Sequence, residues 1–426
     1  MSGTVARLGR RLQTQAFWMM ASDVFAVAMA ISLPWSTSLV AIFSAFWLGA
    51  VALTFDYRAY MQFMRRPACF LPSVFFLLVV IGTLWSDASW ASRFYAVGPA
   101  LKLLFIPALL FHFQRSVRGQ WVFVAFFASC ALLMVMSWLV AFNPALALKS
   151  GAEYGVPVKN YIDQSQEFAL CAVAPILPVI MLLRAGKIRQ AVLLGAVALS
   201  FLINMLFVVV SRTALVTMPI MLAVFAVIHF KWRTNLAMLL MAVVLATLAW
   251  MTSPKLRWTA ETFYRDYYYY KLQDEPTSVG LRLEFWKKSL GFFAEAPVFG
   301  HGTGSTRGLF ERSASRPTSG KVFASGEVIG NPHNQTLNAA VQWGTVGIVV
   351  LYAMWLYHLL LFRGESLAAW VGLLVVVQNF FTSLFNSHLF DFHEGWMYVL
   401  GVGVAGGMVL GEQQRKARSA SGSAFR

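Results

Sequence analysis

The sequence predicts an all-α integral membrane protein with about twelve transmembrane helices and one large polar loop. Its 426 residues are 58% hydrophobic and only 12% charged, with a mean hydropathy of +0.64. The apolar residues form runs of about 18 or more, which is the length that crosses a bilayer as a helix. One long polar stretch, residues 253–335, interrupts this pattern, and we expect the chemistry to lie there because functional groups collect on loops held by a rigid scaffold.

Hydropathy along the chain predicts where the transmembrane spans lie. We expect them at about 16–33, 38–55, 69–86, 98–113, 121–143, 166–183, 190–210, 213–230, 234–252, 336–361, 366–385 and 390–411. An even number of spans returns both termini to one side. The chain then divides into helices 1 to 9 (1–252), the polar loop (253–335), helices 10 to 12 (336–411) and a tail (412–426).

Basic residues are distributed unequally between the two sets of connections. Alternate connections carry 18 Lys and Arg against three acids, whereas the opposite short connections hold only Arg93, Lys149, Lys159 and Arg212. Positive residues favour the cytoplasmic side, so both termini are predicted to be cytoplasmic and the polar loop to face outward. Positive charge scattered between the spans in this way reflects membrane topology, so we do not expect a nucleic-acid partner.

Residues 190–230 require a hairpin. Arg212 is the sole Lys, Arg, Asp or Glu in this stretch, which as one helix would be roughly 60 Å long, twice the thickness of the bilayer core. Arg212 is therefore placed at the tip of the hairpin, on the outer side, where positive charge is disfavoured.

The polar loop contains an expected short amphipathic helix from Gly280 to Ala294, which breaks before Pro297. Arg282 and Trp286 are four residues apart and share one face of it. An aromatic run from Phe263 to Lys271, which includes Arg265, suits the headgroup region. We expect the loop to lie on the membrane and not to form a separate domain.

His333 precedes the tenth span directly and is the candidate general base. The positive end of a helix dipole and nearby arginines disfavour the imidazolium, and a neutral imidazole can accept a proton. The same helix end offers free N–H groups to an anion. The alternative role for His333 is to cap the loop.

Arg212, Arg265 and Arg282 are outer-side cations, which suggests a phosphate or pyrophosphate ligand because the guanidinium fork matches phosphate oxygens. Contact with lipid headgroups or an internal ion pair is the alternative for each. The turn Gly300-His301-Gly302-Thr303-Gly304-Ser305 allows close backbone approach, either to a substrate or simply within a loop.

Two further patterns are assigned structural roles. Gly401-Val-Gly403-Val-Ala-Gly406 matches the dinucleotide fingerprint but lies inside a span, so we expect close helix packing. His388, Asp391, His393 and Glu394 are metal-ligand types near the eleventh and twelfth spans. They lack a tetrahedral spacing signature, so we expect a hydrogen-bonded rim near the site and no metal or other cofactor.

These features together resemble the O-antigen ligases and related O-antigen polymerases of bacterial inner membranes. The resemblance rests on the twelve spans with one large loop before the last three, and on Arg282 with Trp286, the Pro297 to Gly304 turn, and His333-Asn334 followed by Gly344 and Gly347. Arg212 resembles the outer-side arginine that the ligases require. Pro332 before His333 is a departure that leaves the loop geometry open.

The resemblance implies a GT-C-like glycosyltransferase fold and a metal-independent, inverting transfer on the periplasmic face of the inner membrane. The implied donor is a polysaccharide on undecaprenyl pyrophosphate, and the implied acceptor is a sugar hydroxyl of lipid A core. His333 is then the base, with Arg212 and Arg282 on the pyrophosphate. We expect substrate contacts from Arg265, Trp286, His301, Gly302, Gly304 and Asn334.

Alternatives remain open at this stage. An O-antigen polymerase or a protein O-oligosaccharyltransferase would have a similar site. A secondary transporter or lipid flippase is a candidate from a different class, but transporters tend to place paired charges at the middle of the membrane. Here the polar groups gather toward the predicted outer surface.

Overall fold

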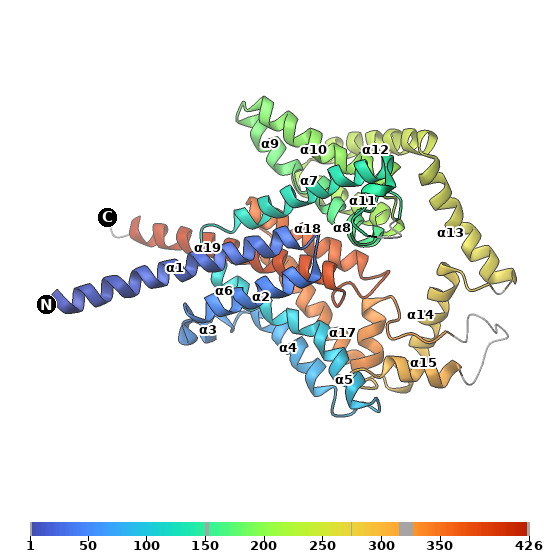
Figure 1. Cartoon of the computed structure of the whole chain (residues 1–426), viewed down its shortest axis with the longest axis horizontal. Helices are drawn as coiled ribbons and strands as arrows, with labels where there is room; N and C mark the ends of the chain where they lie inside the picture. Colours follow the sequence, from blue (N-terminus) through green and yellow to red (C-terminus); the bar gives the residue numbers. More distant parts are fainter. Residues whose placement is uncertain (1, 150–152, 274, 315–326, 424–426) are drawn as a thin grey trace.

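The computed structural model describes residues 2–149, 153–273, 275–314 and 327–423, which form helices and connections without a strand (Figure 1). The elements of the first half are α1 (Ser2–Ser32), α2 (Thr37–Ala52), α3 (Tyr57–Phe63), α4 (Pro67–Ile81), α5 (Trp90–Val97), the 3₁₀ helix η1 (Gly98–Leu104), α6 (Phe105–Phe113), α7 (Gln120–Phe142), the 3₁₀ helix η2 (Pro144–Leu146), α8 (Tyr161–Val173), α9 (Ile176–Arg184) and α10 (Ile188–Phe207). Those of the second half are α11 (Arg212–His229), α12 (Trp232–Thr252), α13 (Pro254–Gln273), α14 (Ser278–Glu295), α15 (Thr306–Ala314), α17 (Gln335–Leu361), α18 (Leu367–Thr382) and α19 (Phe392–Ser423).

Every expected span coincides with an apolar helix or pair of helices. Within the described residues nine helices are long and apolar enough to cross a membrane, or ten if the bent pair α2 and α3 forms one span. The two remaining expected spans fall on α4 and α18, which have 15 and 16 residues and are shorter than a full crossing. The chain is thus an all-helical integral membrane protein.

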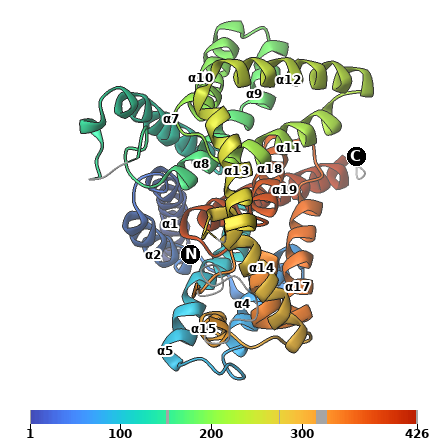
Figure 2. The same ribbon diagram turned by 90° about the vertical axis from the view of Figure 1, so that its right-hand side faces the viewer.

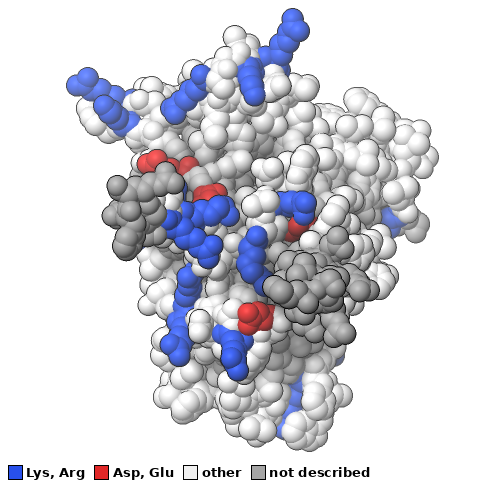
Figure 3. All heavy atoms as spheres, turned by 90° about the vertical axis from the view of Figure 1, so that its left-hand side faces the viewer, with Lys and Arg blue, Asp and Glu red and all other residues white. Residues whose placement is uncertain are grey.

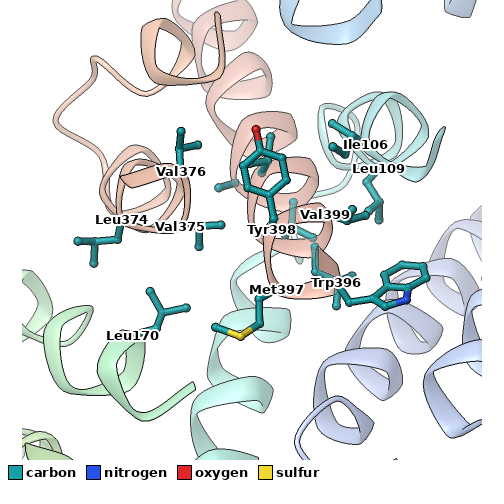
Figure 4. Packing of buried hydrophobic residues seen from close by; sticks show 14 of the residues in the cluster. Ile106, Leu109, Leu170, Leu374, Val375, Val376, Trp396, Met397, Tyr398 and Val399 are labelled. Carbon is teal, nitrogen blue, oxygen red and sulfur yellow. The ribbon is translucent and has the colours of Figure 1, made fainter. Parts of the chain in front are cut away.

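The core of the bundle is built around α19. Its apolar window is 94% buried, whereas that of α12 is only 6% buried. Figure 4 shows Tyr398 and Val399 of α19 among side chains of α18, such as Val375, and of α6, such as Leu109. A helix that is apolar all round is stable only when such neighbours enclose it, or when lipid does.

Small residues let the neighbours of α19 approach closely. A Cβ added at Gly403 would lie 2.5 Å from the Cβ of Leu109, and one at Gly401 would lie 2.7 Å from a methyl group of Val375. The glycine pattern in this span therefore packs helices, as the sequence predicted.

One end of the bundle carries mostly positive charge on its surface. Helices α1 and α19 project at one end, and this face displays many Lys and Arg side chains and few acids (Figures 1 and 3). Positive charge is thus concentrated on this face of the molecule.

Helices α13, α14 and α15 cover the opposite end (Figure 2). α14 packs against α17, and α13 packs against α10 and α14. Phe285 and Phe292 of α14 form a small apolar cluster with Phe310 of α15 and Val341 of α17. The polar loop is thus attached to the bundle through its own core, and the amphipathic helix expected from Gly280 to Ala294 is present as α14.

Charged residues inside the bundle have partners. The Asp23 carboxylate lies 2.8 Å from Nε2 of His112 and 3.5 Å from Arg118, and Glu167 lies 3.3 Å from the Lys159 amine. Lys102 donates to the backbone oxygens of Phe390, at 3.1 Å, and Asp391. Pairing of this kind offsets the cost of charge in apolar surroundings.

The packing around α19 yields a stability prediction. Gly403→Ala should destabilise the protein by about 1–3 kcal/mol, because its methyl group overlaps Leu109 in a filled core. Gly195→Ala on α10 is the matched control, since a Cβ there meets nothing within 4 Å. Thermal unfolding midpoints in one detergent should fall for Gly403→Ala and not for Gly195→Ala; equal midpoints would contradict this packing.

Candidate active site

The connection before α17 holds His333 in an unusual conformation. Its φ of 53° is left-handed, the one positive φ of a residue other than glycine within the described ranges. Asn334 caps α17 by accepting a hydrogen bond from the Leu337 amide at 3.0 Å. A residue other than glycine adopts this conformation only where its surroundings fix it. His333 thus lies at the N-terminus of a helix, as predicted.

The fixing surroundings are a second connection, between α18 and α19. Asn334 Nδ2 donates to the Leu384 oxygen at 3.0 Å, the Gln335 amide donates to the Ser383 oxygen at 2.8 Å, and the Leu389 amide donates to Gln335 Oε1 at 3.2 Å. We call this set of bonds, between residues 331–335 and residues 383–391, the seam. Asn334 is therefore occupied with capping and with the seam.

The imidazole of His333 has one nitrogen bound and one free. Nδ1 lies 2.9 Å from Oδ1 of Asn386, and the ring stacks on Phe285 with centroids 6.1 Å apart. Nε2 makes no hydrogen bond with any residue that the structure describes, and it is not among the buried unpartnered atoms. This nitrogen is available to a substrate.

The environment keeps His333 neutral. Burial lowers the pKa of His333 below its usual 6.5, and the positive charges of Arg282 and His388 act in the same direction. The hydrogen bond with Asn386 and the charge of Asp391 oppose this shift without cancelling it. A neutral imidazole with a free nitrogen can accept a proton at pH 7.

Arg282, whose charge acts on His333, lines a cavity of about 400 Å³. Arg212 and Arg282 both line it, together with the aromatic side chains of Tyr154, Tyr161 and Trp258. The size is typical of a pocket for a small ligand. The cavity thus combines two guanidinium groups with an aromatic wall.

Arg212 stands at the start of α11, at the tip of the predicted hairpin. Its Nη1 and Nη2 each donate to one oxygen of Asp266 at 3.2 Å, and Nη1 also donates to Ser278 Oγ at 3.2 Å. These bonds use three of the five N–H donors of a guanidinium. The side chain is therefore held in place while it keeps donors for a ligand.

Arg282 connects the cavity to His333. Burial lowers the pKa of Arg282, the Tyr161 phenol opposes the shift, and the positive charge of Arg212 lowers the pKa further. Arg282 also lowers the pKa of His333 by its charge. One guanidinium therefore acts electrostatically both on the cavity and on the candidate base, and it stays charged because arginine does not deprotonate in proteins.

The glycine turn makes its close approaches to protein backbone. Gly302 has a φ of +87°, and a Cβ there would lie 2.6 Å from the Cα of Ser86. Its amide donates to the Gln342 oxygen at 2.8 Å, and the Gly304 amide donates to Gln342 Oε1 at 2.8 Å. His301 Nε2 lies 2.8 Å from the Phe292 oxygen. These contacts fill the turn with neighbouring segments and bind it to α17.

The turn meets α17 where that helix is interrupted. Gly344 has φ 61° and ψ −152°, and a Cβ there would lie 2.4 Å from the backbone of Val298. The Thr345 amide donates to the Pro297 oxygen at 2.8 Å. The resemblance pointed to Gly344 and to this turn separately, and the structure places them in contact.

Arg212 and Arg282 line the cavity, whereas the other predicted site residues, His333 included, lie outside its lining. Arg265 is exposed on α13 and donates to Thr262 on the same helix at 3.3 Å. Trp286 packs against the Phe285 and Phe292 cluster, and its Nε1 is buried without a hydrogen bond. The lining residues include neither of them.

The metal-ligand types near α19 separate into two groups. His388, Asp391 and Glu394 offer atoms within 4.8 Å of one another, and His393 instead pairs with Asp163 at 2.5 Å. Burial disfavours charge on His388, but Glu394 and Asp391 outweigh it and raise its pKa to about 9. A cationic His388 balances the charge of these carboxylates.

Sequence reasoning missed three partners in this site: Asp266, which holds Arg212; Ser278; and Asn386, which binds His333. Asn386-Ser387-His388 is a polar run next to an apolar span, and this was the available signal.

Comparisons with known proteins place the candidate residues in a family domain. Residues 196–352 match the family model described as O-antigen ligase, a range that contains Arg212, Arg282 and His333. An uncharacterized protein of Haemophilus influenzae is 25% identical over 260 residues, which cover 59% of this chain and 62% of that protein. The match to this relative thus spans less than two thirds of its length. The resemblance read from the sequence is confirmed as a match to the O-antigen ligase family model over residues 196–352.

Proposed function

We propose that this protein is a glycosyltransferase of the O-antigen ligase type. It transfers a polysaccharide from undecaprenyl pyrophosphate to a sugar hydroxyl of lipid A core, at the periplasmic face of a bacterial inner membrane. The observation that carries the proposal is the free Nε2 of a neutral His333, whose pKa is lowered by the charge of Arg282, one of two arginines that line the cavity. The match of residues 196–352 to the O-antigen ligase family model supports the same class of reaction.

The charge distribution supports the orientation. The end of the bundle with α1 and α19 is rich in Lys and Arg, and positive residues favour the cytoplasm. The cavity and His333 lie toward the end that carries α13 to α15. No nucleotide is supplied in the periplasm, so a donor there must arrive already activated, and a lipid-linked pyrophosphate meets this need.

The proposed reaction follows from the positions of the two arginines and of His333. The acceptor hydroxyl oxygen forms a bond to the anomeric carbon while the bond from that carbon to the pyrophosphate oxygen breaks. The pyrophosphate leaves with the bonding electron pair, and Arg212 and Arg282 stabilise its charge. The hydroxyl proton passes to Nε2 of His333. A single displacement inverts the anomeric carbon.

Fixed guanidinium groups supply the role that a cation serves in other phosphate-releasing enzymes, so we propose a metal-independent reaction. The cavity's aromatic wall of Tyr154, Tyr161 and Trp258 suits either a sugar face or the lipid interface.

The first prediction of this proposal concerns transfer itself. With a chelator present, wild-type protein in lipid should move glycan from undecaprenyl pyrophosphate to lipid A core with an inverted linkage. His333→Ala should reduce the rate by about 10²–10⁴-fold and Arg212→Ala by about 10²–10³-fold. Arg307→Ala on α15 is the control, because this exposed arginine pairs only with Glu311 four residues away among the described residues.

The products decide between related activities. Longer glycan on the lipid carrier without use of lipid A core would indicate a polymerase, and transfer to protein hydroxyls would indicate an O-oligosaccharyltransferase. Equal rates for wild type and His333→Ala, or a retained linkage, would contradict the mechanism.

A second prediction tests the cavity without turnover. Inorganic pyrophosphate should bind the purified protein, and Arg212→Ala and Arg282→Ala should each weaken it tenfold or more, because a charge-assisted hydrogen bond contributes about 1.5–3 kcal/mol. Calorimetry with Arg307→Ala as the control provides the measurement. Unchanged affinity in both cavity variants would place the anion elsewhere.

A third prediction concerns pH. Neutral His333 is the active form, so kcat/KM should fall as pH drops through the lowered pKa of His333 and should be constant above it, until another group titrates. Arg282→Gln removes a charge that lowers this pKa, so the acidic limb of the remaining activity should move to higher pH. The same limb in Arg307→Gln should not move; a shift there would show that the effect is not local.

A further inference from the structure

We propose that Asn386 is the positioning residue of this site, because its amide, held between His333 and Asp391, fixes the imidazole proton on Nδ1 and leaves Nε2 as the accepting atom. This inference rests on the proposed function in that it names how the base is prepared. It concerns residues 386 and 391, which lie outside the range 196–352 that matches the family.

The orientation of the Asn331 side-chain amide is fixed by the backbone N–H of His333, which can only donate. Oδ1 of Asn331 accepts the backbone N–H of His333 at 3.0 Å and the Ser387 hydroxyl at 2.7 Å. The backbone N–H leaves no alternative, since an amide NH₂ in the same position would face another donor. The NH₂ of Asn331 therefore faces Oδ1 of Asn386, at 3.3 Å.

The orientation of the Asn386 side-chain amide is fixed independently by its contact with Asp391. Nδ2 of Asn386 donates to Oδ2 of Asp391 at 2.7 Å. An ionised carboxylate only accepts, so the oxygen of Asn386 must point away from Asp391. Both arguments give the same result, which is that Oδ1 of Asn386 faces His333.

The tautomer of His333 follows from these orientations. Its Nδ1 lies 2.9 Å from Oδ1 of Asn386, an atom that only accepts, so the proton must be on Nδ1. In a neutral imidazole the other nitrogen is then an acceptor, and Nε2 is the free one. The opposite tautomer would place two acceptors against each other at Nδ1 and leave Nε2 unable to take a proton.

Two basic side chains, His388 and Lys102, lie near Asp391. His388 Nδ1 lies 3.2 Å from Oδ2 of Asp391, and the Lys102 amine donates to the backbone oxygens of Phe390 and Asp391. The charges that act on His333 are thus Arg282 from α14 and Asp391 and His388 from the neighbouring connection. This arrangement follows the general pattern in which a third group orients the base.

A spectroscopic measurement tests the tautomer directly. The full chain in lipid nanodiscs, with ¹⁵N-labelled histidine, contains seven histidines, and the His333 signals are assigned as those lost in His333→Ala. At a pH where the ring is neutral, wild type should show a protonated Nδ1 and an unprotonated Nε2. Asn386→Ala should shift the population toward the opposite tautomer. Unprotonated Nδ1 in the wild type would overturn the proposal.

Asn386→Asp is the conservative variant. One oxygen of its carboxylate still accepts from Nδ1, and the other meets Oδ2 of Asp391, where the two carboxylates should share one proton. The tautomer and measurable transfer should therefore persist. Asn386→Ala should reduce kcat/KM by at least about tenfold while the donor KM stays near the wild-type value. A purely structural role would affect Asn386→Asp and Asn386→Ala alike, which would overturn the proposal.

Glu394→Gln is the matched control, since Glu394 lies 3.6 Å from His388 in the same cluster and is not among the groups that shift the pKa of His333. This variant should keep the wild-type tautomer. The spectrum requires no turnover, so an absence of transfer by wild type would count against the proposed function alone. A wild-type tautomer in Asn386→Ala would count against the positioning role alone.

Discussion

The seam between the two connections is the interaction on which the site depends. Polar backbone groups near a bilayer must find partners within the protein, because lipid offers none. Residues 331–335 and 383–391 satisfy one another, through bonds such as that from the Gln335 amide to the Ser383 oxygen at 2.8 Å. The same contacts hold His333 in its left-handed conformation and bring Asn386 against its ring. Packing of α14 on α17 then sets Arg282 nearby, so one region of satisfied backbone positions the imidazole, its amide partner and its neighbouring charge.

The arrangement of helices was largely predictable because hydropathy is a local property of the sequence. The twelve expected spans coincide with apolar helices, and the hairpin places Arg212 at the start of α11 as predicted. What the sequence did not reveal are the interruptions inside spans. α17 breaks at Gly344, and the span that ends at Phe113 begins eight residues earlier than expected and passes through a 3₁₀ segment. These irregularities satisfy contacts with distant segments, such as Val298 against Gly344, and no local pattern encodes them.

The sequence predicted which residue types form the site, but it did not predict which residues contact one another there. Arginine and histidine on the outer side of a membrane protein indicated anion binding and proton transfer, and Arg212, Arg282 and His333 do lie in one region. The glycines were expected to offer backbone to a substrate, but Gly302 approaches Ser86, more than two hundred residues earlier in the chain. Asn386 is 53 residues from His333, and no spacing rule joins two such positions. Long-range pairs of this kind require coordinates.

In the proposed reaction, Arg282 would couple proton transfer to departure of the leaving group. Its charge lowers the pKa of His333. A pyrophosphate group seated against Arg282 would compensate that charge, and the imidazole would become a better proton acceptor at the moment when a donor is in place. Departure of the leaving group would restore the original field and favour release of the captured proton. In the proposed reaction, the basicity of His333 would therefore follow the occupancy of the cavity.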